Sequence, residues 1–361
     1  MNKKIKIGII STAFVFFLAI VTVSVLNEQR MNRLYSEPTQ DNPQSIVPLN
    51  QIVSGGPPPD GIPSIDSPKF TTVDQAEGFM SDNDLILGVN INGDVRGYPL
   101  QILVWHEIVN DNVGGTPIAV TYCPLCFTNQ VFNRTVGGEI LEFGTSGKLY
   151  NSNLVMYDRN SDSLWSQAMA QSIVGKFAGA SLERIPFDLA YWKDWKNLYP
   201  NSKILSKDTG NIRPYGADPY GDYYTNSDIL FPVPIEDDRL GLKEIVIGVE
   251  ATGNYKAYKL KDVENFKVIN DKINDKPITI WSAFPFMVKM FNPIVDAQTL
   301  TFRHDDEKKA FIDNQTGSEW NFDGKSINGA LSGKTLSRLP FDEGFWFEWV
   351  AFHPKTDVYS Q

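Results

Sequence analysis

Two stretches of the chain share one pattern of apolar and polar positions. In each, apolar residues alternate with polar ones on both sides of a short turn, Asn-Gly-Asp at 92–94 and Thr-Gly-Asn at 252–254. Alternation with a period of two around such a turn predicts a β-hairpin. After the first hairpin, the amphipathic segment 100–109 predicts a short helix, and an apolar run that ends at Tyr122 predicts a strand.

The shared pattern extends to residue identities. GVNINGDVRGYPL, which starts at Gly88, recurs as GVEATGNYKAYKL from Gly248, and matched Gly, Pro and Trp positions continue toward the end of the chain. Such self-similarity predicts two tandem copies of one module of about 110 residues. We expect a β-dominated α+β fold in which the two copies pack as a pseudo-twofold pair. Each copy ends in a Trp-x-x-Trp segment, whose rings share one helix face and should lie in the core.

The first residues carry a different signal. Residues 7–26 are uncharged and mostly apolar and follow a basic tip, which predicts a transmembrane helix after a cytoplasmic tip. The run is longer than the core of a typical signal peptide, and no small-x-small cleavage site follows it. We therefore expect a retained single-pass anchor in the cell membrane rather than a removed leader. In either case the soluble part of the protein lies outside the cytoplasm.

Changes in composition divide the chain into five parts. We expect the cytoplasmic tip and membrane anchor at 1–26, a flexible tether rich in Pro, Gly and Ser at 27–63, and the first module at 64–205. A bridging segment at 206–243 then leads to a second, degenerate module at 244–361. The net charge of −10 and the lack of clustered Lys and Arg argue against a nucleic-acid partner.

The candidate chemistry lies in Thr-Tyr-Cys-Pro-Leu-Cys at 121–126, which holds Cys123 and Cys126, the two cysteines of the sequence. Two sulfurs spaced in this way can form a structural disulfide, present a reactive thiolate or bind a soft metal ion. Thiols outside the cytoplasm are not kept reduced by glutathione. We therefore expect the pair to be disulfide-bonded or metal-bound unless a dedicated reductant serves it.

Comparison of the two copies adds His106 to this candidate site. An ungapped alignment of the two copies places apolar residues opposite His106, Cys123 and Cys126. His106 is opposite Phe266, Cys123 is opposite Ala283, and Cys126 is opposite Phe286. Apolar counterparts imply inward-facing positions, where an imidazole needs a partner. Two thiolates and one imidazole suit copper, and Met156 is either a further soft ligand or part of the core.

A polar segment at 143–153 has no equivalent of the same length in the second copy. It is either an ordinary loop or a polar lip over the sulfur site that binds substrate or orients the ligands. The candidates for these roles, inside and outside this segment, are Trp105, Tyr122, Ser146, Tyr150, Asn151, Asp158 and Gln167.

Two long motifs point to a family. GVNINGDVRGYPLQILVWHEIVNDNVGGTPIAVTYCPLCFTNQVFNR and FGTSGKLYNSNLVMYDRNSDSLWSQ resemble the prokaryotic domain-of-unknown-function family 3179, over about residues 61–359. The resemblance implies an exported or membrane-anchored protein but no settled reaction. The family pattern usually has Gly after the second cysteine. Phe127 stands there in this chain, which would narrow access to Cys126.

Three functions remain open at the level of the sequence. The first is an extracytoplasmic soft-metal protein that binds or transfers copper through Cys123, Cys126 and His106 and meets a metal-donor protein. The second is a thiol–disulfide oxidoreductase that uses the two cysteines with a redox partner. The third is a non-catalytic binding module with a structural disulfide. The motifs for haem attachment, phosphate-binding loops and serine-hydrolase elbows are missing from the sequence.

Overall fold

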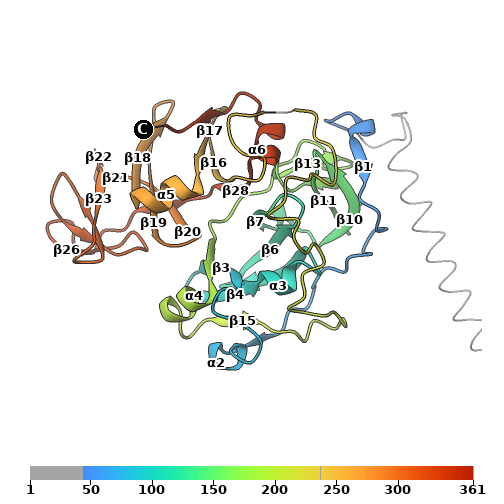
Figure 1. Cartoon of the computed structure of the whole chain (residues 1–361), viewed down its shortest axis with the longest axis horizontal. Helices are drawn as coiled ribbons and strands as arrows, with labels where there is room; N and C mark the ends of the chain where they lie inside the picture. The colour runs from blue at the N-terminus through green and yellow to red at the C-terminus, as the bar shows by residue number, and fades with distance from the viewer. Residues whose placement is uncertain (1–43, 236, 361) are drawn as a thin grey trace, which may run out of the picture.

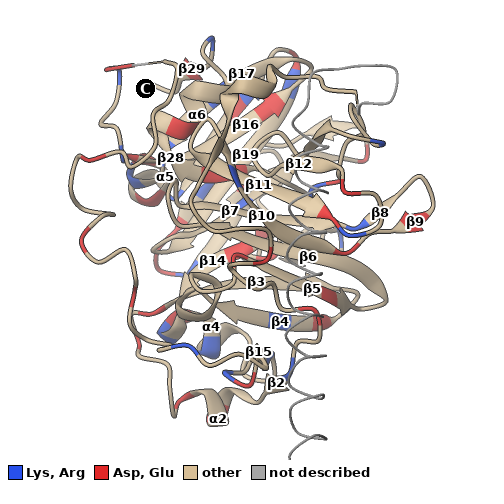
Figure 2. Ribbon diagram, turned by 90° about the vertical axis from the view of Figure 1, so that its right-hand side faces the viewer, with Lys and Arg blue, Asp and Glu red and all other residues tan. Residues whose placement is uncertain are grey.

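The computed structural model describes residues 44–235 and 237–360, and the chain is β-dominated, as the sequence predicts. The predicted anchor at 7–26 and the first part of the predicted tether lie outside the described residues. Within the described residues, no helix is both long enough and apolar enough to cross a bilayer. Figure 2 shows that basic and acidic residues are interspersed over the ribbon.

The first half of the described chain opens with short elements and continues into a series of sheets. Residues 49–76 form η1 (Leu49–Gln51), β1 (Ile52–Ser54), β2 (Phe70–Thr71) and α2 (Val73–Ala76). The next elements are β3 (Leu85–Ile91), β4 (Asp94–Pro99), α3 (Leu100–Leu103), β5 (Ile108–Val113), β6 (Thr116–Cys123), β7 (Thr128–Asn133), β8 (Thr135–Val136) and β9 (Glu139–Ile140). They are followed by β10 (Phe143–Tyr150), β11 (Asn153–Asp158), β12 (Leu164–Ser166), β13 (Gln171–Val174), β14 (Asp188–Tyr191), α4 (Trp192–Leu198) and β15 (Lys203–Leu205).

The second half presents its elements in nearly the same order. It begins with β16 (Ile245–Ala251), β17 (Asn254–Lys259), α5 (Leu260–Phe266), β18 (Val268–Ile273), β19 (Lys276–Phe284), β20 (Met287–Asn292), β21 (Ile294–Val295) and β22 (Gln298–Thr299). It ends with β23 (Phe302–Asp305), β24 (Ala310–Asp313), β25 (Glu319–Trp320), β26 (Ser326–Asn328), β27 (Ser337–Leu339), β28 (Asp342–Phe345), α6 (Trp346–Phe352) and β29 (Asp357–Val358). A duplication would produce this shared order, and the duplication itself stays a prediction.

The two predicted hairpins are confirmed. β3 pairs with β4, and β16 pairs with β17, in each case as an antiparallel hairpin. Both residues of the first turn have positive φ, 52° at Asn92 and 82° at Gly93. In the second turn, φ is 53° at Thr252 and 77° at Gly253. Turns of this hand match the twist of the strands that they join.

One seven-stranded sheet joins the two halves of the chain. Its order is β29-β17-β16-β28-β7-β6-β5, so β28 of the second half lies beside β7 of the first, and Glu343 is paired with Asn129 (Figure 1). Conversely, β14 of the first half contacts β20 of the second. Asp188 of β14 forms ion pairs there with Arg338 at 2.5 Å and Lys289 at 3.5 Å.

Three local predictions need correction. The helix predicted at 100–109 ends at Leu103, because the chain turns through Glu107 with φ of 59° and continues as β5. The segment 143–153 is β10 and its turn to β11 instead of a loop. The end of the predicted tether is folded, since β1 pairs with β10 and the main-chain oxygen of Pro63 lies 2.6 Å from His106 Nδ1.

The tryptophan rings of both Trp-x-x-Trp segments are buried, as predicted. Trp195 of α4 lies against Gly88 of β3, and Trp349 of α6 lies against Gly248 of β16. The absence of a side chain on the strand leaves room for each ring. The glycine that both hairpins carry at this position is therefore explained by packing.

We expect Gly88→Ala and Gly248→Ala each to lower the free energy of unfolding by about 1 to 3 kcal/mol, the usual cost of overpacking a core. A Cβ at these positions would lie 2.0 Å from the ring of Trp195 and 2.3 Å from the ring of Trp349. Urea unfolding of the full chain measures the change. Gly241→Ala is the control, because no atom lies within 4 Å of its Cβ position. A wild-type midpoint for Gly88→Ala would contradict the packing argument.

Candidate functional site

The two cysteines lie at a tight connection between two central strands. Cys123 is the last residue of β6 and is paired with Thr128, the first residue of β7, while Cys126 lies in the turn between them. Both are free thiols in the structure, with exposed fractions of 2% and 0%. The turn ends at Phe127, whose φ of 57° lies in the left-handed region that favours glycine.

The corresponding turn of the second half is one residue shorter. Ala119 is paired with Phe132, thirteen residues later, whereas Thr279 is paired with Phe291, twelve residues later. The ungapped alignment that placed Phe286 opposite Cys126 is therefore wrong. Phe286, with φ of 64°, is the counterpart of Phe127, so it does not stand opposite Cys126, and the shorter turn carries no cysteine.

Side-chain donors fix the Cys126 sulfur. Thr128 Oγ1 lies 3.1 Å from Cys126 Sγ, and Asn153 Nδ2, from the start of β11, lies 3.2 Å from it. Asn153 Nδ2 also donates to Gln167 Oε1 at 3.1 Å. Gln167 Nε2 donates in turn to Thr121 Oγ1 at 2.8 Å and to the carbonyl oxygen of Thr128 at 3.2 Å. Because these buried groups satisfy one another, the polar network can be kept inside the core.

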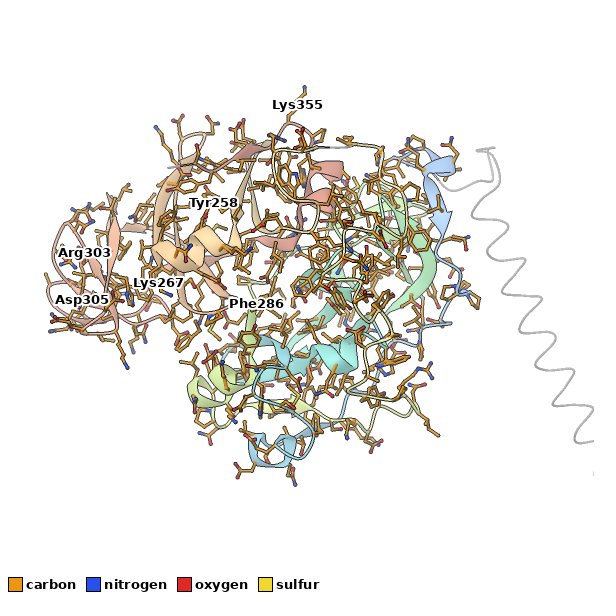
Figure 3. All side chains as sticks on the ribbon, in the orientation of Figure 1. Tyr258, Lys267, Phe286, Arg303, Asp305 and Lys355 are labelled. Carbon is orange, nitrogen blue, oxygen red and sulfur yellow. The ribbon has the colours of Figure 1, made fainter. Side chains whose placement is uncertain are left out.

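The second half and the bridging segment cover the cysteine turn. The backbone N–H of Phe345 donates to the carbonyl oxygen of Cys126 at 2.8 Å, and the Tyr223 hydroxyl donates to the carbonyl oxygen of Leu125 at 2.7 Å. The Phe127 ring contacts the rings of four residues: Tyr122, Tyr224, Phe286 and Phe345. Figure 3 shows Phe286 near the middle of the molecule, whereas Arg303 and Asp305 lie at one extremity.

A pocket of about 440 Å³ opens at this aromatic cluster. Tyr122 and Phe127, the neighbours of the two cysteines in sequence, line it together with Tyr224 and Lys243 of the bridging segment and Phe345 of β28. Three parts of the chain therefore build one mostly apolar recess next to the cysteine turn, and neither cysteine is among the residues that line it. Such a recess is the usual form of a small-ligand site.

Burial dominates the electrostatics of the site. It raises the pKa of the Cys126 thiol well above its usual range, and the hydrogen bond and charge of Cys123 raise it further. Burial also raises the pKa of Glu348 well above its usual range, with a further contribution from the charge of Cys126. The carboxyls of Glu107 and Glu343, both buried, have pKa values of about 8 for the same reason. Glu107 and Glu343 therefore hold their protons near neutral pH.

His106 is engaged elsewhere. Its Nδ1 lies 2.6 Å from the carbonyl oxygen of Pro63, so this nitrogen carries the proton, and its Nε2 accepts from the Tyr215 hydroxyl at 2.6 Å. Throughout 44–235 and 237–360, no three or more His, Cys, Asp or Glu side chains form a group able to hold a metal ion. The predicted ligand set of His106 with the two cysteines is therefore not assembled, and copper binding stays a prediction.

The other predicted site residues divide into two groups. Gln167 belongs to the network around Cys126, and Tyr122 lines the pocket, with its hydroxyl 3.5 Å from that of Tyr224. The remaining residues have other partners. Met156 is buried opposite Trp165, and Asp158 accepts a hydrogen bond from Trp165 Nε1. Three side chains donate to backbone carbonyl oxygens: Ser146 to Val155, Asn151 to Ala351, and Trp105 to Ala217. The Tyr150 ring packs on the Phe352 ring.

The sequence did not single out Thr128, Asn153 or Glu348, which complete the surroundings of Cys126. Thr128 is two residues from Cys126 and is the nearest hydroxyl in sequence. Glu348 stands in the otherwise apolar run Trp346–Phe352, and a lone acid in such a run indicates a buried carboxyl with a specific partner. That signal was available before the structure.

We expect Phe127→Gly to speed alkylation of the full-length reduced protein by iodoacetamide on the order of tenfold or more, because the ring cluster protects the thiols from local opening. Quenched samples analysed by mass spectrometry give the rate at each cysteine. Asn274→Gly is the matched control, since it relieves the same left-handed backbone conformation, with φ of 52°, at an exposed turn outside the ring cluster. Equal rates for Phe127→Gly and wild type would show that the ring does not limit access.

The raised pKa values of Glu107 and Glu343 have a definite effect on stability. Above about pH 4.5 the unfolded chain releases protons that the folded chain keeps up to about pH 8, so the free energy of unfolding should fall across this range. Glu343→Gln should reduce that fall and stabilise the protein at pH 8 by about 1 kcal/mol or more. Urea midpoints at pH 5 and pH 8 measure the difference. Glu307→Gln, at an exposed position, is the control, and a pH dependence unchanged by Glu343→Gln would contradict the assignment.

Comparison with known proteins agrees with the resemblance seen in the sequence. No curated protein and no solved structure matches the chain. A family model described as a protein of unknown function (DUF3179) matches residues 59–356, which include both halves and the bridging segment. The chain therefore belongs to the DUF3179 family of proteins of unknown function.

Proposed function

We propose that this protein exchanges thiols and disulfides through Cys123 and Cys126, outside the cytoplasm and attached to the membrane by residues 7–26. The observation that carries the proposal is the pair of free, buried thiols on one turn, with Cys126 Sγ 3.9 Å from the carbonyl oxygen of Cys123. Two thiols separated by two residues on one turn can open and close one disulfide. The pocket beside Tyr122 and Phe127 supports the approach of a substrate.

The two sulfurs have different roles in this proposal. Burial raises the pKa of the Cys126 thiol and leaves it no exposed surface, so we assign Cys126 as the resolving thiol and Cys123 as the attacking one. The Cys123 thiolate forms a bond to one sulfur of a substrate disulfide, and the other substrate sulfur leaves as a thiolate. Cys126 then loses its proton and attacks the Cys123 sulfur, which releases the second substrate thiolate. Two electrons pass to the substrate, and a dithiol protein that supplies two electrons resets the site.

The second half acts as a structural partner in this proposal. We infer that it is a copy that lacks the site, because its turn is shorter and carries no cysteine. The shared order of elements supports this inference. Its contacts with the cysteine turn through Phe345 support a role in holding the site closed.

Single-cysteine variants of the full-length protein test the function. Cys126→Ser should accumulate a mixed disulfide on Cys123 when a small disulfide is added, whereas Cys123→Ser should form little adduct. In wild type, mass spectrometry should find a reversible Cys123–Cys126 bond with a reduction potential above about −300 mV, the upper bound typical of structural disulfides. A bond that resists dithiols, or the absence of any adduct in Cys126→Ser, would rule the function out.

A further inference from the structure

A buried carboxyl of the second half reaches the cysteine turn of the first. Glu348, in α6, has an exposed fraction of 4%. The Thr128 hydroxyl lies 3.1 Å from Cys126 Sγ, and its hydrogen bonding to the Glu348 carboxyl lowers the pKa of that carboxyl against the effect of burial. Gly344 marks where these groups converge, since a Cβ there would lie 2.9 Å from Thr128 Oγ1 and 3.5 Å from Glu348 Oε2. A side chain at 344 would separate the strand from the turn.

The Thr128 hydroxyl has one proton to donate and two possible acceptors, Cys126 Sγ and the Glu348 carboxyl. When Glu348 is ionised, the hydroxyl donates to the carboxylate. When Glu348 is protonated, the carboxyl donates to Thr128 Oγ1, and the hydroxyl is free to donate to Cys126 Sγ. The proton on Glu348 therefore decides whether Cys126 receives this hydrogen bond, which favours a thiolate there.

We propose that Glu348 donates and accepts the proton of Cys126 through the hydroxyl of Thr128. This inference rests on the proposed exchange function and deepens it. When the Cys123–Cys126 bond is opened by an attacking thiolate at Cys123, the Cys126 sulfur leaves with the electron pair. It takes the Thr128 proton, and Thr128 takes the proton of Glu348. When Cys126 attacks Cys123, the Glu348 carboxylate left by the opening step takes the Cys126 proton back through Thr128, so neither direction leaves a charge on the buried sulfur.

The surroundings of Glu348 suit this role. The charged and titratable groups that act on it are Cys126, Asp342 of β28 and Arg184. Arg184 and Asp342 form an ion pair at 3.3 Å. The Asp342 carboxylate therefore offsets much of the effect of the Arg184 charge on Glu348. Burial and the nearby sulfur raise the pKa of the carboxyl, which keeps a proton available near neutral pH.

Four variants of the full-length protein separate a proton relay from a purely structural role. Glu348→Gln keeps the shape but has no proton to transfer, and Thr128→Val removes the hydroxyl, whereas Thr128→Ser restores it. Glu343→Gln is the matched control, because it removes an equally buried carboxyl of the same strand–helix unit, whose pKa is raised by burial and by Glu264 rather than by Cys126. The rates of opening by dithiothreitol and of closure by glutathione disulfide are measured from pH 5 to pH 9.

We expect Glu348→Gln and Thr128→Val to slow closure and opening at pH 7 about 10²-fold, the lower end for general acid–base catalysis. In both variants the opening and closure rates should lose the pH dependence that the ionisation of Glu348 causes in wild type. Thr128→Ser and Glu343→Gln should retain the wild-type profile, and circular dichroism checks that each variant folds. A wild-type profile in Glu348→Gln, in a protein that exchanges normally, would overturn the relay alone. No exchange in wild type would overturn both the relay and the proposed function.

Discussion

The pairing of β28 with β7 is the constraint on which the rest of the structure depends. It continues one sheet from the second half into the first, with Glu343 beside Asn129. The end of β28 then meets the cysteine turn, where Phe345 N–H bonds to the carbonyl oxygen of Cys126, and α6 follows directly. Through this pairing the second half covers the cysteine turn, and the carboxyl of Glu348 is buried close to Thr128.

Burial of a polar site is costly, and the local network shows how this chain meets the cost. An unpaired buried polar group costs roughly 1 to 3 kcal/mol, so an amide beside a sulfur must be satisfied on all sides. Asn153 and Gln167 bond to each other as well as to Cys126 and Thr121. The same low-dielectric environment raises the pKa of Cys126 and Glu348. One environment therefore fixes the geometry and shifts both acids.

Features set by local pattern were predictable from the sequence, and features set by distant contacts were not. Both hairpins and the buried Trp-x-x-Trp rings followed from short-range periodicity. The partners of His106 did not, because Pro63 and Tyr215 lie 43 and 109 residues away from it. The strand at 143–150 was missed because its polar side chains bond within the sheet and to the tether end. The turn that contains Phe286 is one residue shorter than the cysteine turn, and an alignment of the two copies without gaps could not detect this difference.

The distance along the chain between the parts of the site also bears on how the protein matures. Gln130 and Asp342, which bond across the β7–β28 junction, are 212 residues apart. Contacts of such large separation form slowly, because a long loop must close first. During synthesis the cysteine turn therefore emerges well before the strand that covers it. At the location proposed above, outside the cytoplasm, the pair would meet soluble oxidants in that interval, and its redox state at the end of folding would depend on how soon the C-terminal half arrives.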